Sequence, residues 1–121
     1  MDFDYFRGNV IPESDIEKAL DYLRSSASEA AQARANVKYL AEFLKTKRAQ
    51  LKMAQVGMSN AAAEDAALAD PSYAQLLDGY KEAVRQDAFH SFKREAADAL
   101  IRAWQTQSSN ARTEGRAYGQ T

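Results

Sequence analysis

The segment that decides the fold runs from Ser14 to Leu51 and reads "SDIEKALDYLRSSASEAAQARANVKYLAEFLKTKRAQL". It contains neither proline nor glycine. Its apolar and small residues recur at steps of three and four, if Arg34 and Arg48 fill two gaps, at Ile16, Leu20, Leu23, Ala27, Ala30, Val37, Ala41, Leu44 and Leu51. Such spacing is typical of a helix with one apolar stripe. Because Ser14 and Glu17 have the spacing of a capping box and Gly57 is the first helix breaker, we predict a helix over 14–56.

Two further helices are expected downstream. Ser59 or Asn60 can cap a short linking helix over 60–69. Asp70 and Pro71 then form a helix start, with Asp70 as N-cap and Pro71 at the first helical position, so the next helix is predicted over 72–113. Gly79 inside it costs about 1 kcal/mol relative to alanine and permits another backbone to approach closely.

These elements predict an all-α fold, a long antiparallel helical hairpin over 14–113. Residues 1–13 form an N-terminal arm and residues 114–121 a flexible tail. The expected pairing places Leu51 near Leu77 and Leu44 near Val84.

Much of the apolar content is alanine, so the core is thin, and we expect two copies to pair as a dimeric four-helix bundle or coiled coil. The seam that forms the core and the dimer contact is predicted at Ile16, Leu20, Leu23, Val37, Leu44, Leu51, Leu77, Val84, Ile101 and Trp104.

The composition restricts the classes of function. The chain has 121 residues, a net charge of −1 and no cysteine, which excludes disulfides, thiol nucleophiles and the usual zinc sites. No stretch approaches 18 apolar residues and the N-terminus is acidic, so we expect a cytoplasmic protein with no membrane contact. There is neither a glycine-rich phosphate loop nor a nucleophile elbow. We therefore predict that the chain is not an enzyme and binds no cofactor or metal.

Two polar features on the helices have alternative interpretations. Asp87 and His90 share a helix face at the spacing of di-iron ligands, but a local Asp–His pair is favoured over a metal site. Arg34 and Arg48 interrupt the apolar stripe. They either hold a phosphate or partner carboxylate or, as we favour, point outward or pair with Asp87, Glu82 or Asp98 to fix the helix register.

A basic stretch near the end of the first helix is a candidate for nucleic-acid binding. It contains Lys38, Lys45, Lys47, Arg48 and Lys52 against a single acidic residue, Glu42. The alternative needs no ligand, because cations near a helix C-terminus interact favourably with the helix dipole. The near-zero net charge also argues against a protein dominated by nucleic-acid binding.

The N-terminal arm is a candidate partner-binding segment. It alternates acidic and aromatic residues, and its candidate contacts are Phe3, Tyr5, Phe6 and Arg7. Equally, its aromatic side chains can pack back onto the bundle and cover an open end.

Near the C-terminus, "RAWQTQSSNAR" (102–112) joins a tryptophan on the apolar face to a polar extension. With "ARANVKYLAEFLKTKRAQL" and "ADPSYAQLLDGYKEAV", this stretch resembles small helical proteins encoded by tailed phages, often near recombination and replication genes. The resemblance covers residues 30–112. It implies a protein of the host-cell cytoplasm that serves phage DNA metabolism or host takeover, and it assigns no functional residues.

We therefore expect a non-enzymatic phage accessory protein that binds another protein in DNA recombination or replication. A first alternative is an inhibitor that sterically blocks a host nuclease, polymerase or defence complex. The near-neutral charge argues against an inhibitor that mimics DNA. A second alternative is weak direct nucleic-acid binding through residues 38–52.

Overall fold

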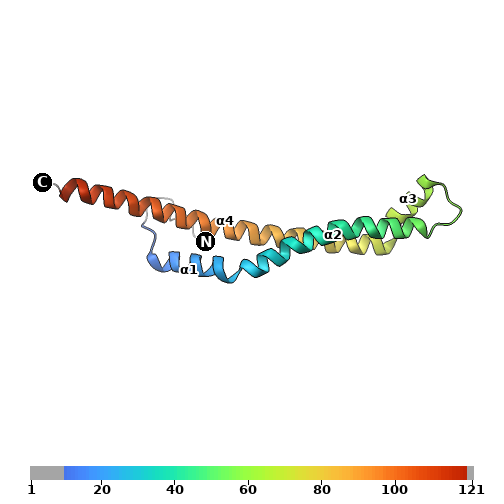
Figure 1. Ribbon diagram of the computed structural model, residues 1–121, viewed down its shortest axis with the longest axis horizontal. Helices are drawn as coiled ribbons and strands as arrows, with labels where there is room; N and C mark the ends of the chain where they lie inside the picture. Colours follow the sequence, from blue (N-terminus) through green and yellow to red (C-terminus); the bar gives the residue numbers. More distant parts are fainter. Residues whose placement is uncertain (1–9, 120–121) are drawn as a thin grey trace. The chain divides into compact units, whose positions relative to one another are not determined.

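A computed structural model describes residues 10–119 and contains four helices and, over that range, no strand (Figure 1). The helices are α1 (Glu13–Ser25), α2 (Ala27–Met53), α3 (Asn60–Ala69) and α4 (Pro71–Gly119). The predicted all-α class is confirmed, as is the helical hairpin, because α4 packs against α2. The chain divides into two compact units. Unit 1 holds the described residues up to Ala27 together with those from Ser91 onward, and unit 2 holds Ser28–His90.

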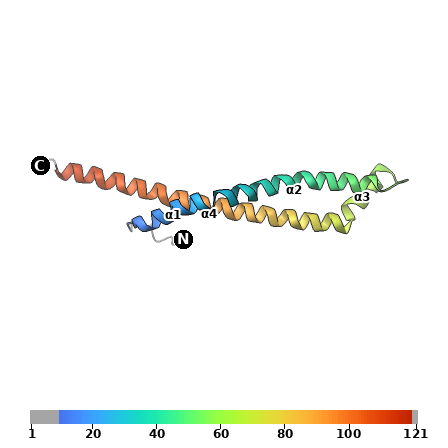
Figure 2. The same cartoon turned by 60° about the horizontal axis from the view of Figure 1, so that its bottom comes forward.

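Unit 2 is the hairpin itself, in which α2 lies alongside the first part of α4 with α3 at their shared end (Figures 1 and 2). Its buried apolar residues are few and mostly small, namely Ala33, Leu44, Ala63 and Ala67. Two ion pairs tie its helices together: Arg34 of α2 lies 3.5 Å from Asp87 of α4, and Arg48 pairs with Glu64 of α3. Arg34 thus has one of the partners expected from the sequence, whereas Glu64 was not anticipated for Arg48.

The register of the hairpin differs from the expected one. With Arg34 beside Asp87, an antiparallel pairing puts Leu44 level with Leu77, seven residues from the expected Val84. Because apolar residues recur every seven positions, both registers bury similar stripes and the sequence pattern does not separate them. The ion pair between Arg34 of α2 and Asp87 of α4 distinguishes the two registers.

The helix starts show which capping predictions hold. Ser59 caps α3, its hydroxyl accepting a hydrogen bond from the Ala62 N–H at 3.2 Å. Asp70 precedes Pro71 as expected, and its carboxylate accepts hydrogen bonds from the Ser72 hydroxyl and, at 2.8 Å, from the Ser72 N–H. These two hydrogen bonds lower the pKa of the Asp70 carboxyl. The predicted capping box at Ser14 is wrong, because α1 begins one residue earlier, after Pro12, without a side-chain cap.

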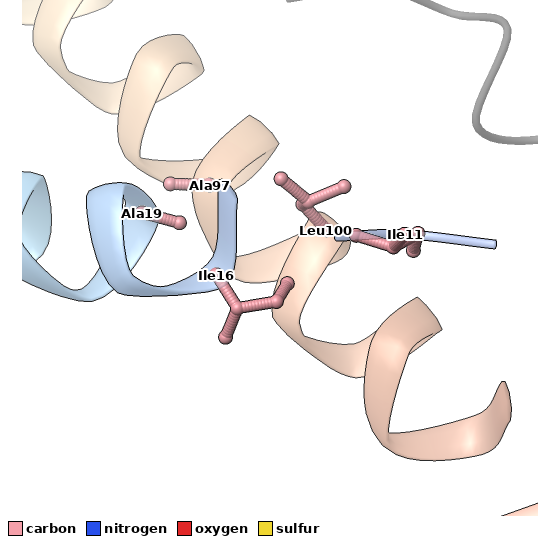
Figure 3. Close-up of a cluster of buried hydrophobic side chains, with 5 residues drawn as sticks. All are labelled: Ile11, Ile16, Ala19, Ala97 and Leu100. Atoms are coloured by element: carbon pink, nitrogen blue, oxygen red, sulfur yellow. The ribbon is translucent and has the colours of Figure 1, made fainter. Parts of the chain in front are cut away.

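Unit 1 has its own small core between α1 and α4 (Figure 3). Its buried members are Ile11, Ile16, Ala19, Ala97 and Leu100, with the Trp104 ring packed against them. The Ile11 N–H also donates a hydrogen bond to the Gln107 side-chain oxygen at 3.2 Å. Gln107 belongs to the polar stretch after Trp104, so part of that stretch holds the chain just before α1.

The predicted continuous helix over 14–56 is interrupted at Ser26, between α1 and α2. Serine pairs are common sites of helix kinks, since their hydroxyls compete for backbone hydrogen bonds. Ser25 and Ser26 form such a pair, and Arg94 of α4 stabilises the interruption. Its Nη1 donates to the Leu23 carbonyl and to the Ser26 hydroxyl, both at 2.8 Å.

The last helix, α4, continues to Gly119, whereas we expected it to end at Thr113. Glu114, Arg116 and Ala117 are good helix formers, and they outweigh Gly115 in this segment. The Thr106 and Thr113 hydroxyls donate to carbonyls four residues earlier, at 3.1 and 3.0 Å, which keeps them within the helix.

Gly57 in the α2–α3 connection has a φ of +82°, the sole positive φ within residues 10–119. We expect Gly57→Ala to lower the free energy of unfolding by about 1–2 kcal/mol, because an L-residue is strained in this conformation. A Cβ at Gly57 would meet nothing within 4 Å, so no clash contributes. Thermal unfolding followed by circular dichroism measures the loss. Gly115→Ala, at an equally open helical position, should be neutral or slightly stabilising, and equal losses for the two variants would contradict the backbone explanation.

Candidate protein-binding site

The apolar tip, which we define as Met53, Val56 and Met58, consists of the last residue of α2 and two residues of the connection between α2 and α3. These three side chains are 81%, 93% and 51% exposed. They fall within Met53–Ala63, where no residue is charged although 27% of the chain is. Single exposed apolar residues are ordinary, but large ones gathered in one uncharged segment are typical of a contact surface.

The backbone of the tip is fixed at both ends. On the α2 side, the N–H groups of Ala54 and Gln55 donate to the carbonyls of Gln50 and Lys52. On the α3 side, the Ser59 cap starts the next helix, and the Ala63 N–H donates to the Ser59 carbonyl at 2.9 Å. The turn between them depends on Gly57. The apolar side chains are therefore presented on an ordered connection.

The Arg48–Glu64 ion pair joins α2 to α3 just behind the tip. Ala63 and Ala67, the buried residues of α3, anchor this short helix. Methionine side chains adapt to irregular apolar surfaces because they are unbranched and polarisable. The arrangement suits insertion into an apolar pocket on another protein.

Helical periodicity does not predict this site. A usable signal was present, namely an uncharged run of 11 residues containing three large apolar side chains at a turn. Apolar residues at a turn do not recur every three or four positions, so a pattern of helical periodicity does not include them.

A shallow groove of about 450 Å³ runs between α2 and α4 in unit 2. Its polar lining includes Gln32 and Asn36 from α2 and Glu82, Gln86 and His90 from α4. The Glu82 carboxylate accepts hydrogen bonds from Arg85 at 2.7 and 2.9 Å and from Gln86 at 3.1 Å. These hydrogen bonds lower the pKa of Glu82 to about 2. Its charge is thus already balanced by Arg85.

The candidate nucleic-acid residues lie along α2 (Lys38, Lys45, Lys47, Arg48 and Lys52). Several have acidic neighbours within the chain: Lys45 pairs with Glu42 at 3.2 Å, Arg48 pairs with Glu64, and Lys47 contributes to lowering the pKa of Asp70. These contacts reduce the positive charge available to a phosphate backbone. The structure gives the nucleic-acid hypothesis no added support.

Within residues 10–119, Asp87 and His90 do not belong to a cluster of side chains able to hold a metal ion. Asp87 is directed to Arg34, and His90 Nδ1 is buried without a hydrogen-bond partner within residues 10–119. Across the same range, no three His, Asp or Glu side chains gather closely enough to hold a metal ion.

The predicted seam is only partly buried. Ile16 and Leu44 are buried, and Leu23, Val37, Leu51, Ile101 and Trp104 are half-buried. Leu20, Leu77 and Val84 are exposed and therefore lie outside the core of this chain, whereas the dimer contact expected of them stays a prediction. The stripe fails there because the break at Ser26 and the shifted register change which residues face the partner helix.

The proposed contacts of the N-terminal arm, Phe3, Tyr5, Phe6 and Arg7, lie outside the described residues. The neighbouring part of unit 1 contains a second shallow groove, of about 460 Å³. Val10, Trp104, Gln107, Asn110 and Glu114 are among its lining residues. Within the stretch "RAWQTQSSNAR", the Trp104 ring therefore packs against the unit 1 core and the Gln107 side chain accepts a hydrogen bond from the Ile11 backbone. Other residues of the stretch line the groove.

Comparison with known proteins adds no relative. No protein-family model matches the chain, and no curated protein or solved structure matches it. Within residues 10–119, none of the helices combines the length and apolarity required to cross a membrane.

Proposed function

We propose that the chain is a non-enzymatic phage accessory protein that binds another protein through the apolar tip. The observation that supports this is the exposure of Met53, Val56 and Met58 on an ordered, uncharged connection. Burying such side chains in a partner's pocket contributes about 25 cal/mol for each Å² of apolar surface removed from water. Large side chains of this kind act as anchors in protein interfaces.

The setting we propose is DNA recombination or replication in a phage-infected cell, where the protein acts in the host cytoplasm. It rests on the resemblance of residues 30–112 to small phage proteins. The charge pattern agrees with protein binding rather than nucleic-acid binding, because the net charge is −1 and two lysines of α2, Lys45 and Lys47, have acidic neighbours.

Capture from infected cells with tagged variants tests the proposal. We expect Val56→Glu to reduce recovery of the bound protein at least tenfold, because a carboxylate would have to be buried in an apolar pocket. Ala35→Glu is the matched control, since it adds the same charge at an exposed position of α2, and it should recover as much as the wild type. Quantitative mass spectrometry of three replicates gives the readout.

Equal recovery by wild type and Val56→Glu, with unchanged circular dichroism, would refute a role for the tip. The identity of the protein lost with Val56→Glu also separates the two settings. A phage recombination or replication protein supports the accessory role, whereas a host nuclease, polymerase or defence protein supports the inhibitor alternative.

A further inference from the structure

A second surface of unit 2, separate from the tip, carries exposed aromatic side chains. Tyr39 and Phe43 of α2 stack with their ring centroids 5.9 Å apart and their planes 13° apart. Tyr39 is 65% exposed and Phe43 is half-buried. A stacked pair that remains open to solvent provides a preformed apolar anchor for another chain.

Gly79 of α4 has no explanation within the chain. It lies in the interior of a helix, where glycine costs about 1 kcal/mol relative to alanine. Its φ is not positive, and a Cβ at this position would meet nothing within 4 Å. Neither its backbone conformation nor packing inside the chain requires glycine. Close approach of another molecule would account for it.

The aromatic pair and Gly79 lie on the same side of the hairpin. Asn36 and Gln86 both line the groove between α2 and α4. Tyr39 follows Asn36 by three residues on α2, and Gly79 precedes Gln86 by seven on α4, so each shares a helix face with a groove residue. Ala83, four residues after Gly79, lines the same groove. We call this surface, defined by Tyr39, Phe43, Gly79 and Ala83, the aromatic face.

The two halves of the aromatic face are complementary to each other. In the register set by Arg34 and Asp87, Tyr39 is level with Glu82 and Phe43 with Asp78. Each ring is therefore within about one residue, or 1.5 Å along the axis, of a small residue on α4, Tyr39 of Ala83 and Phe43 of Gly79. A two-fold axis running along the hairpin would place α2 of one copy over α4 of the other at the same level. Both aromatic pairs would then lie over small residues at once.

The charges and surface area are compatible with a second copy. The groove beside the aromatic face presents the amides of Gln32, Asn36 and Gln86 and the carboxylates of Glu29 and Glu82. The Glu82 charge is balanced by Arg85, and uncharged side chains outnumber the charged ones in this lining. The partner would bury the rings of Tyr39 and Phe43 together with the surface of α2 and α4 around Gly79 and Ala83. A standard interface needs about 800 Å² from each partner.

We propose that the aromatic face binds a second copy of this chain, with Tyr39 and Phe43 of each copy seated on Ala83 and Gly79 of the other. The contact is isologous and closes at two copies. It is independent of the apolar tip, which stays available for a different protein.

Sedimentation velocity at 5–200 µM, a range chosen to span about micromolar affinities, tests the proposal. The wild type should sediment as a dimer, and Gly79→Leu should sediment as a monomer, because leucine occupies the space needed by the partner's Phe43. Leucine favours helix more than glycine does, so a folding defect is not expected. Lys81→Leu, two residues away on another face of α4, is the matched control and should remain dimeric. A monomeric wild type, or a dimeric Gly79→Leu, would overturn the proposal.

Disulfide trapping tests the register, since the chain has no cysteine of its own. Mixing Phe43→Cys with Gly79→Cys under mild oxidation should give a cross-linked dimer, with each variant alone giving at least fivefold less. A mixture of Lys38→Cys with Gly79→Cys should remain at that lower level. Equal cross-linking in the two mixtures would show that the two copies do not pair in this way. Val56→Glu should still dimerise, so failure of this inference and failure of the proposed function are distinguishable.

Discussion

Leu100→Ala is expected to lower the free energy of unfolding by about 2–5 kcal/mol, the usual range for removing a buried leucine side chain. Leu100 is buried in the unit 1 core, beside Ile11 (Figure 3). Because the neighbouring core residues include two alanines, few side chains can move in to fill the cavity. Trp104 packs against this core and is the single tryptophan, so its fluorescence during urea denaturation reports on unit 1.

Leu20→Ala is the control for this prediction. Leu20 lies on α1 in the same unit but is 42% exposed, and its loss should cost less than about 1 kcal/mol. Similar costs for the two variants would mean that Leu100 does not sit in a packed core.

Arg94→Met should destabilise unit 1 by about 3–6 kcal/mol, the sum for two hydrogen bonds from a charged donor. Arg94 donates two hydrogen bonds of 2.8 Å, to the Leu23 carbonyl and the Ser26 hydroxyl, and hydrogen bonds from charged donors contribute about 1.5–3 kcal/mol each when partly buried. Methionine retains much of the apolar stem, so the loss reports mainly on these hydrogen bonds. Without them the buried Ser26 hydroxyl and a helix-end carbonyl lose their partner.

Arg102→Met on the same helix is the matched control. Arg102 pairs with Asp98 one turn earlier at the surface, an interaction that contributes at most about 0.5 kcal/mol. Trp104 fluorescence again gives the readout. Amide hydrogen exchange at 22–27 should rise in Arg94→Met and stay unchanged in Arg102→Met. Unchanged exchange in both variants would show that Arg94 does not hold the break between α1 and α2.

Local sequence signals accounted for the helices but not for the boundaries that depend on distant residues. Ser59, Asp70 and Pro71 set helix ends through contacts within three residues, and these predictions were confirmed. The break at Ser26 was missed because the residue that stabilises it, Arg94, is 68 positions away. The predicted end of α4 was wrong because the helix formers Glu114, Arg116 and Ala117 outweigh Gly115.

For the candidate sites as well, the sequence indicated features that depend on nearby residues and missed those that depend on the tertiary structure. The sequence indicated that Gly79 permits another backbone to approach closely. In the structure the space beside Gly79 is open, and this supports the proposed aromatic face. It also marked Arg34 and Arg48 as register residues, and both proved to be paired with carboxylates. The apolar tip was not marked at all, since its exposure depends on where the chain turns.

By itself the sequence determined that the chain forms long helices and folds back at the segment between Gly57 and Pro71, because periodicity, caps and breakers act over a few residues. The tertiary structure alone decided the register, the interruption at Ser26 and which apolar side chains stay exposed. The physical reason is that a seven-residue repeat permits several registers of nearly equal burial. Contacts between distant residues, such as Arg34 with Asp87 and Arg94 with Ser26, select one of them.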